Sequence, residues 1–305
     1  DVTVVAPLRY RSATGRHLFD LPAYTLDGES PTPLDAGTFA ALVRRELALG
    51  TPEADLTTGT DLLRRVFASR RATERFVAGS EWDAPADLTP TFVEAEQSLV
   101  YGHQMHPTPK SREGVADYEV PTFAPDLGGE FRLRYFAADP TIVTDRSARP
   151  HSAAEWVSSA LDASDADVPP EAAAALEDGR VLVPTHPWQA EYLTSRPHVE
   201  ETLDTGLLAD LGQFGPTFHP TSSVRTLWSP DAPFMVKGSL AVQITNSERT
   251  TKRAELRQGV LASRLVNGEF GDLLAERFPR FTIVEDPAAL TLDIGDEPES
   301  GFETV

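Results

Sequence analysis

The chain has 305 residues, which is enough for one large or two ordinary domains with a substantial core. It contains no apolar run near the length of a bilayer span, so we expect no membrane partner. Its net charge of −20 argues against a broad surface for nucleic acid or for acidic lipids.

Lysine is rare among the basic residues. Of 27 basic residues only Lys110, Lys237 and Lys252 are lysines, against 47 Asp and Glu. Such surfaces are typical of cytosolic proteins of salt-accumulating halophiles, whose carboxylates stay hydrated under strong screening, so we expect function at high salt. The absence of cysteine excludes disulfides and thiolate chemistry, and the first ten residues show no signal peptide. We therefore expect a cytoplasmic protein.

The first hundred residues predict a mainly helical lobe after an irregular start. Capping residues and apolar spacing predict helices over 36–49, 61–78 and 90–101, which end at Gly50, Gly79 and Gly102. The next segment, 102–126, is rich in proline and polar residues, which is typical of a functional loop rather than an element.

After this loop the pattern changes to mixed α and β. We predict strands over 131–137, 141–144, 180–184, 222–228, 234–245 and 281–284, and helices over 153–162, 171–176, 188–194, 199–211 and 251–266. The expected fold class is α+β, with a helical lobe over residues 1–101 and a mixed α/β lobe with an antiparallel sheet over residues 102–305.

The segment 221–249 reads as a β-hairpin that carries a cluster of basic and hydroxyl side chains. Residues 229–233, SPDAP, supply the turn, and the second strand alternates with Lys237, Ser239, Gln243 and Thr245 on its polar face. A hairpin that is symmetric about Asp231 would place Arg225 opposite Lys237 and Ser223 opposite Ser239.

This predicted pairing suggests an anion site. Like charges directly opposite each other destabilise a sheet. An anion bound between Arg225 and Lys237 would offset their repulsion, and phosphate is the leading candidate. Arg249 precedes Thr250 and Thr251, a predicted N-cap whose helix would add further donors. The alternatives are an exposed strand with solvated cations, or a register slip that separates the pair.

A second segment, YGHQMHPTPKSREG over residues 101–114, gathers four donor side chains on a stiff loop. His103, His106, Lys110 and Arg112 fall within ten residues, among two prolines and two flanking glycines. The histidines could ligate a metal, but the adjacent cations would oppose a dication and suit a polyphosphate better. The alternative is a surface loop whose histidines cap nearby carbonyls.

A third segment, VLVPTHPWQ over residues 181–189, is an apolar strand that runs into a helix near Trp188. Such junctions often present side chains to a site at the edge of a sheet. From the residues alone, His186 is as consistent with a structural hydrogen bond as with a ligand contact.

Together the three segments resemble one family, the IucA/IucC family of NRPS-independent siderophore synthetases. GHQMHPTPKSREG resembles its GHPxHPxxKxRxG motif, VPTHPWQ resembles its HPWQ box, and TSSVRT with KGSLAVQITNSER resembles its SxRT and KxxxxxQITxxxR signatures. The match covers about Tyr101 to Glu255, with the motifs in the family order.

The resemblance implies an enzyme that adenylates a carboxylate of citrate, or of a citryl intermediate, with ATP and Mg²⁺ and then forms an amide with an amine or hydroxylamine. The phosphates of ATP would be held by Ser223, Arg225, Lys237, His103, His106, Lys110 and Arg112. Citrate would be bound by Thr245, Arg249, Gln243 and His186, and Arg249 and His106 would serve catalysis, with no metal ligand assigned.

The chain also departs from the family pattern. Gln104 replaces the proline that is usual between the two histidines. Family members are about twice this length, and their second half carries further His and acidic residues. The resemblance therefore implies the thumb and fingers regions without the C-terminal palm lobe and its metal ligands. We expect no turnover from this portion alone, and a homodimer is possible.

Two other functions remain open from the sequence. One is a different acyl-adenylating ligase, which would share the cationic hairpin and use another acid. The other is a catalytically incomplete anion-binding module that serves as a scaffold.

Overall fold

The computed structural model describes residues 2–27, 30–52, 57–79, 89–103, 106–164, 167–244 and 247–305, without the side chains of residues 27, 247 and 249. The chain forms two compact units: the first comprises residues 1–78 and 101–112, and the second residues 79–100 and 113–305. Each unit is described by itself below. The lobe boundary near residue 101 stays a prediction.

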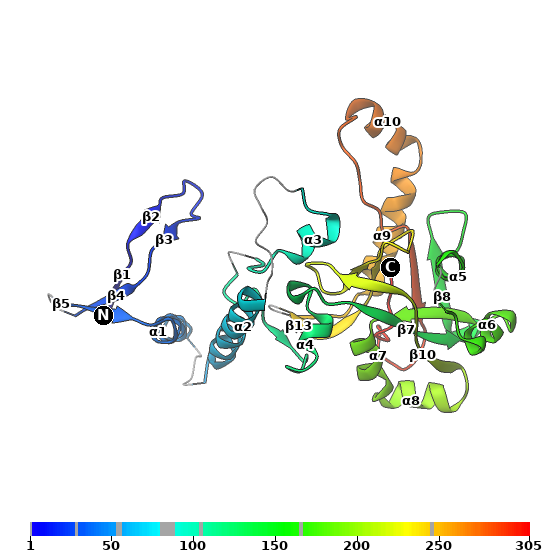
Figure 1. The fold of residues 1–305 in the computed structure, drawn as a ribbon, viewed down its shortest axis with the longest axis horizontal. Coiled ribbons are helices and arrows are strands. Elements are labelled where there is room, and N and C mark those ends of the chain that lie inside the picture. The colour runs from blue at the N-terminus through cyan, green and yellow to red at the C-terminus, as the bar shows by residue number, and fades with distance from the viewer. Residues whose placement is uncertain are drawn as a thin grey trace. The chain divides into compact units, whose positions relative to one another are not determined.

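In the described part of the first unit, short strands precede helices α1 and α2 (Figure 1). Strands β1, β4 and β5 form one antiparallel sheet and β2 pairs with β3, so the segment predicted to be irregular is β-structure. Helix α1 has the predicted bounds because Asp35 caps it, accepting hydrogen bonds from two backbone N–H groups, and α2 lies within one residue of its prediction. The elements are β1 (Thr3–Val5), β2 (Leu8–Tyr10), β3 (Leu18–Phe19), β4 (Ala23–Asp27), β5 (Ser30–Leu34), α1 (Ala36–Leu49) and α2 (Thr60–Gly79).

The second unit is built on a five-stranded antiparallel sheet in the order β12-β11-β10-β7-β9. Two smaller sheets accompany it, β14-β13-β6 and β15-β8. The strands are β6 (Arg112–Glu113), β7 (Phe131–Ala138), β8 (Val143–Ser147), β9 (Val181–Thr185), β10 (Leu208–Pro220), β11 (Thr226–Trp228), β12 (Val236–Lys237), β13 (Leu240–Ile244), β14 (Ser247–Arg249) and β15 (Ala288–Leu292).

Helices cover both faces of the sheet. Helices α5 and α6 pack on one face and α7 and α8 on the other, while α9 packs on β15 and β8 (Figure 1). The α-helices of this unit are α3 (Phe92–Gln97), α4 (Val120–Phe123), α5 (Ala153–Ala163), α6 (Pro170–Glu177), α7 (Pro187–Thr194), α8 (Pro197–Asp204), α9 (Arg253–Val266) and α10 (Glu269–Arg277).

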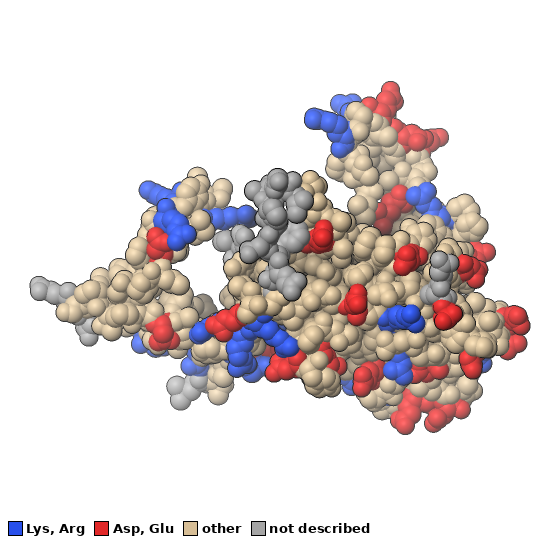
Figure 2. Space-filling model, in the orientation of Figure 1, with Lys and Arg blue, Asp and Glu red and all other residues tan. Residues whose placement is uncertain are grey.

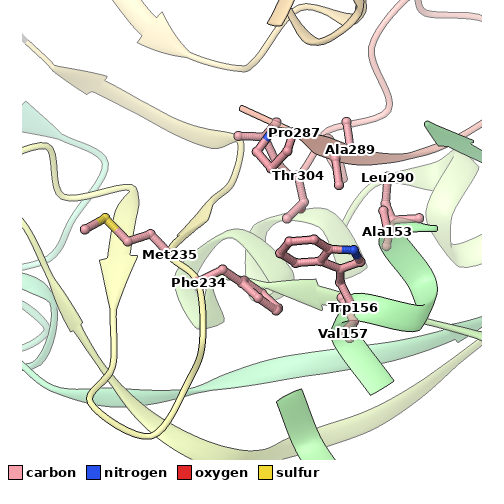
Figure 3. Close-up of a pocket in the computed structure, with 11 residues that line it drawn as sticks. Ala153, Trp156, Val157, Phe234, Met235, Pro287, Ala289, Leu290 and Thr304 are labelled. Atoms are coloured by element: carbon pink, nitrogen blue, oxygen red, sulfur yellow. The ribbon is translucent and has the colours of Figure 1, made fainter. Parts of the chain in front are cut away.

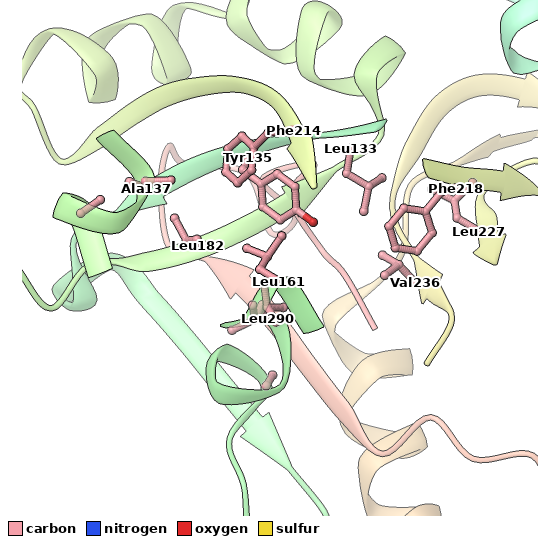
Figure 4. Packing of buried hydrophobic residues seen from close by; sticks show 14 of the residues in the cluster. Leu133, Tyr135, Ala137, Leu161, Leu182, Phe214, Phe218, Leu227, Val236 and Leu290 are labelled. Carbon is pink, nitrogen blue, oxygen red and sulfur yellow. The ribbon is translucent and has the colours of Figure 1, made fainter. Parts of the chain in front are cut away.

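Strand β7 shows why two cores form. Its side chains alternate, so Leu133 and Tyr135 join the cluster under α5 and α6 while Phe136 joins the cluster under α7 and α8. Figure 4 shows the first of these clusters, in which Tyr135 stacks on Phe214 with ring centroids 4.4 Å apart. The mixed fold with an antiparallel sheet is therefore confirmed.

The largest error of the sequence prediction concerns β10. A helix was expected over 199–211, but α8 ends at Asp204 and β10 begins at Leu208. Apolar residues in 199–211 recur at helical spacing, yet Gly206 adopts a positive φ of 73°, which ends the helix. Gly212 and Gly215 also have positive φ, where the pairing of β10 with β7 shifts register.

The predicted strand 234–245 is two strands, β12 and β13, which belong to different sheets, and the predicted loop 102–126 contains β6 and α4. Further differences are smaller. Helix α3 is shorter than the predicted 90–101 and is capped by Thr91, and helix α10 was not predicted. Residues 281–284 are not a strand; β15 follows at Ala288 instead. The N-cap of α9 is Lys252 rather than Thr250 or Thr251. Among the described residues, no helix is both long and apolar enough to cross a membrane.

Candidate functional site

The predicted cationic hairpin exists as β11 and β12, but its register differs by one residue. Lys237 lies opposite Thr226. The predicted pairing of Arg225 with Lys237 is therefore wrong. Ser223 does not pair with Ser239, because β11 begins only at Thr226 and β12 ends at Lys237.

A tight turn before β11 causes this shift. Within residues 221–225, the Thr221 N–H donates to the Thr226 carbonyl (2.9 Å) and the Val224 N–H donates to the Thr221 carbonyl (2.8 Å). Val224 adopts a φ of +65°, which is unusual for a β-branched residue. Such backbone strain often occurs at functional sites, and here it lies directly beside Arg225.

The guanidinium of Arg225 points toward the start of α9. Its Nη1 donates to Thr251 Oγ1 at 2.7 Å, and its carbonyl accepts from the Gly238 N–H at 3.2 Å. The structure thus fixes Arg225 at both its backbone and its side chain. It also brings the arginine to the segment between β14 and α9, as the anion-site hypothesis requires.

Lys237 forms an ion pair across the surface of this unit. Its Nζ lies 3.2 Å from Asp286 Oδ2, and the two side chains are 32% and 45% exposed. An ion pair with this exposure contributes about 0–1 kcal/mol, so an anionic ligand could replace Asp286 at small cost.

Of the other predicted site residues in this segment, the structure describes the side chains of some but not of all. Ser223 is exposed, with its hydroxyl 3.0 Å from that of Thr226. Gln243 is half-buried in β13, opposite Glu248 of β14. Thr245 lies outside the described residues, and for Arg249 the structure describes the backbone in β14 but not the side chain.

The histidine and lysine loop belongs to the first unit. The His106 N–H donates to the His103 carbonyl (2.9 Å), and His106 Nδ1 accepts from the Thr108 N–H (3.0 Å). Lys110 is only 4% exposed, and its N–H donates to the Ser69 hydroxyl of α2 (2.9 Å). The described residues of the loop are therefore held by local hydrogen bonds, and the backbone of Lys110 is held against α2.

Arg112 follows the same loop and lies over an aromatic ring of α2. Its guanidinium carbon is 5.1 Å from the centroid of the Phe76 ring, and Phe76 is buried. A cation over a ring face is attracted to it, and this contact holds the arginine in place. Gly102 has a positive φ, and a Cβ there would lie 3.1 Å from Lys110 Cε, so this glycine permits the close approach.

His186 is deeply buried between two aromatic rings. Its exposed fraction is 4%, and its ring centroid lies 5.0 Å from that of Phe123 and 4.6 Å from that of Phe131. Nδ1 accepts from the Trp188 N–H at 3.1 Å and caps α7. Burial lowers the pKa of His186 to about 3, because the charged form would lose its hydration. This geometry is that of a neutral, structural histidine.

The other residues of the HPWQ box contact the end of the loop motif at Gly114 and the strand motif at Ala241. A Cβ at Gly114, which has a φ of +114°, would lie 3.2 Å from the Trp188 ring. Gln189 is buried, with its Oε1 accepting from the Ala241 N–H (2.7 Å) and its Nε2 donating to the Gly301 carbonyl (3.1 Å). Sequence reasoning missed this buried glutamine, although its place after an apolar strand was a signal.

The carboxylate of Glu303 was also missed. It is fully buried and accepts hydrogen bonds from Ser239 and from residues 300–301. No local sequence pattern indicates this, because 64 positions separate Glu303 from Ser239.

A separate cavity of about 60 Å³ has an apolar lining. Figure 3 shows Trp156 among its lining residues, and the Trp156 and Phe234 ring centroids are 5.6 Å apart. Trp156 Nε1 is buried without a hydrogen-bond partner among the described residues. The cavity is too small and too apolar for a polyphosphate, so it is not part of the anion site.

Comparison with known proteins gives consistent matches. Residues 91–305 match the family model described as "IucA / IucC family". The spermidine-citrate ligase of Bacillus anthracis is 36% identical over 100% of this chain and 51% of that protein. The rhizobactin siderophore biosynthesis protein RhbC of Rhizobium meliloti is 37% identical over 94% of this chain and 49% of its own.

A solved structure agrees over the same extent. The ATP-bound aerobactin synthetase IucA from a hypervirulent pathotype of Klebsiella pneumoniae has a TM-score of 0.86 at 31% identity, covering 95% of this chain and 51% of that chain. The chain spans about half the length of the relatives that it matches.

Proposed function

The chain belongs to the IucA/IucC family, and on that premise we propose that it is part of an ATP-dependent siderophore synthetase. The enzyme would adenylate a carboxylate of citrate, or of a citryl intermediate, and join it to an amine or hydroxylamine as an amide. Relatives named as a citrate ligase and an ATP-bound synthetase support this proposal. Because ATP is the cosubstrate, we place the reaction in the cytoplasm.

The observation that carries the proposal is the fixed pair of cations on the turn and hairpin of the second unit. Arg225 is held by Thr251, and Lys237 is held by an exposed carboxylate that a phosphate could replace. Attack of a carboxylate on the α-phosphate of ATP brings two anions together. Cations that are already in place lower this barrier by charge stabilisation and positioning.

We propose the following division of roles. Arg225 and Lys237 bind ATP phosphates with Ser223 and with the loop residues His103, His106, Lys110 and Arg112. Thr245, Gln243 and Arg249 bind citrate, and Arg249 and His106 act on the reacting groups. For His186 the geometry favours a structural role, since the imidazole is buried and caps α7.

Mg²⁺ is expected to accompany ATP, since divalent ions neutralise nucleotide phosphates. The described residues contain no group of three or more His, Cys, Asp or Glu side chains that could hold a metal. No step of the proposed reaction is therefore assigned to a metal held by these residues. We also propose that residues 1–305 alone do not turn over, since they span about half the length of the relatives. A homodimer is proposed on the resemblance to the family alone.

Citrate-dependent release of pyrophosphate from ATP by the full-length protein at high salt tests the function. Arg225→Ala and Lys237→Ala should each reduce kcat/KM for ATP by about a hundredfold, since each removes a charged contact to phosphate. Arg280→Ala, which removes an exposed arginine outside the site, is the matched control. Release with another acid but not with citrate would indicate a different acyl-adenylating ligase, and no release with any acid would indicate a scaffold.

A further inference from the structure

A buried carboxylate lies behind the cationic hairpin. Glu303 has no exposed surface, and four hydrogen bonds satisfy its two oxygens. Oε1 accepts from the Ser300 N–H (2.7 Å) and hydroxyl (3.2 Å), and Oε2 accepts from the Gly301 N–H (3.0 Å) and the Ser239 hydroxyl (3.0 Å). Arg253 Nε lies 3.9 Å from Oε1. Burying a carboxylate without hydrogen-bond partners is costly. These four hydrogen bonds therefore hold the Glu303 carboxylate in one position.

A chain of hydrogen bonds leads from this carboxylate to Arg225. The Ser239 hydroxyl donates to Glu303, and its oxygen accepts from the Thr251 N–H at 2.9 Å. The Thr251 hydroxyl then accepts from Arg225 Nη1 at 2.7 Å. Ser239 and Thr251 are both buried, so water does not compete strongly for these bonds.

The direction of the chain depends on the carboxylate. Because a carboxylate only accepts, the Ser239 hydroxyl must donate to Glu303, which leaves its lone pairs for the Thr251 N–H. A glutamine at position 303 could instead donate its NH₂ group to Ser239 and compete with Thr251.

The backbone of residues 303–305 also pairs with the backbone of residues 237–239. The Ser239 N–H donates to the Glu303 carbonyl (2.9 Å), and Lys237 and Val305 exchange two hydrogen bonds (2.8 and 3.0 Å). Gly238 pairs antiparallel with Thr304 between them. Residues 303–305 therefore hold the backbone at Lys237 directly and the side chain of Arg225 through Ser239 and Thr251.

We propose that Glu303 is a positioning residue for nucleotide binding, acting through Ser239 and Thr251 on Arg225 and through the backbone on Lys237. The inference rests on the proposed function, in which Arg225 and Lys237 bind ATP phosphates. Glu303 itself touches neither substrate. It holds the guanidinium of Arg225 through Thr251, whereas the hairpin itself holds Arg225 through its backbone carbonyl.

The test measures ATP affinity in the full-length protein by calorimetry, together with KM for ATP and for citrate in pyrophosphate release. Glu303→Gln, Ser239→Ala and Thr251→Val each break one link, and each should raise the Kd and KM for ATP about tenfold. KM for citrate should change less than twofold. Thr251→Ser keeps the hydroxyl and should restore wild-type affinity.

Matched controls separate positioning from stability. Thr202→Val removes a buried hydroxyl bonded within α8, and Asp210→Asn removes a carboxylate paired with Arg134 on the central sheet. Both should lower the melting temperature without changing KM for ATP.

The outcomes distinguish the two proposals. Wild-type ATP affinity in Thr251→Val and Ser239→Ala overturns the positioning role, even if Glu303→Gln fails to fold. A wild-type protein that neither binds ATP nor releases pyrophosphate overturns the proposed function instead.

Discussion

At the scale of single residues, His186 links burial to pH dependence. Burial lowers its pKa from 6.5 to about 3, so between these values the unfolded chain binds a proton that the folded chain does not. The free energy of unfolding contributed by this group therefore falls as pH falls from about 6.5 toward 3. The slope is about 1.4 kcal/mol per pH unit inside this window.

Replacing His186 by Asn should remove this slope. Asn keeps a side-chain oxygen that can accept from the Trp188 N–H and cap α7, but it does not titrate. Urea unfolding at several pH values from 4 to 6 should give a free energy whose pH slope is smaller than that of the wild type by about 1.4 kcal/mol per unit. Parallel slopes for the two proteins would show that the imidazole is not held neutral by the fold.

At the scale of elements, the contact between Gly114 and Trp188 joins the loop motif to the HPWQ box. Gly114 has a φ of +114°, where an L-residue is strained, and a Cβ there would approach the indole to 3.2 Å. Trp188 stacks on Tyr192 and packs on the cluster around Val242, so the ring has little room to move. A side chain at position 114 therefore requires the packed indole to shift by a few tenths of an ångström.

Gly114→Ala should consequently cost more stability than the same change at an open glycine. Gly179 is the matched control, because it has a φ of +77° but no atom within 4 Å of the position that a Cβ would occupy. Chemical unfolding should give a loss of about 1 kcal/mol for Gly179→Ala, from backbone strain alone, and about 2–3 kcal/mol for Gly114→Ala. Equal losses would mean that Trp188 moves aside freely.

Local signals predicted the elements that depend on local chemistry. The glycine stop at Gly50 located the end of α1, and the apolar run before His186 located β9. The first four residues of β10 were mistaken for the end of a helix, because the apolar residues of 199–211 recur at helical spacing and only the backbone shows that Gly206 takes positive φ. The rest of β10 was not predicted. Sequence periodicity does not report the sign of φ at a glycine.

For the proposed site, the sequence motifs indicated the residues but not the register in which β11 pairs with β12. The motifs identified Arg225 and Lys237, yet their pairing depends on the turn at 221–225, where Val224 adopts a conformation rare for valine. The partner carboxylates, Asp286 and Glu303, lie 49 and 64 positions from the residues they contact. Contacts at this sequence distance are set by tertiary packing, which no local pattern encodes.

At the scale of the whole molecule, the charge is divided unevenly between the two units. The first unit has 12 basic and 10 acidic residues, whereas the second has 15 basic and 37 acidic residues. Figure 2 shows Asp and Glu spread over the visible face of the second unit. The excess negative charge therefore falls on the unit that contains the central sheet, where mutual repulsion opposes folding.

Salt should stabilise this fold by screening that repulsion. The Debye length falls from about 10 Å at 0.1 M to about 3 Å at 1 M, which is shorter than most distances between surface carboxylates. Exposed ion pairs such as Lys237–Asp286 also weaken, but each contributes only about 0–1 kcal/mol. The melting temperature should therefore rise steadily with KCl from 0.1 to 2 M. Sucrose, which strengthens burial without screening charge, is the control for general solvent effects. A melting temperature that is flat or falling in KCl would contradict the expectation that this acidic chain is adapted to high salt.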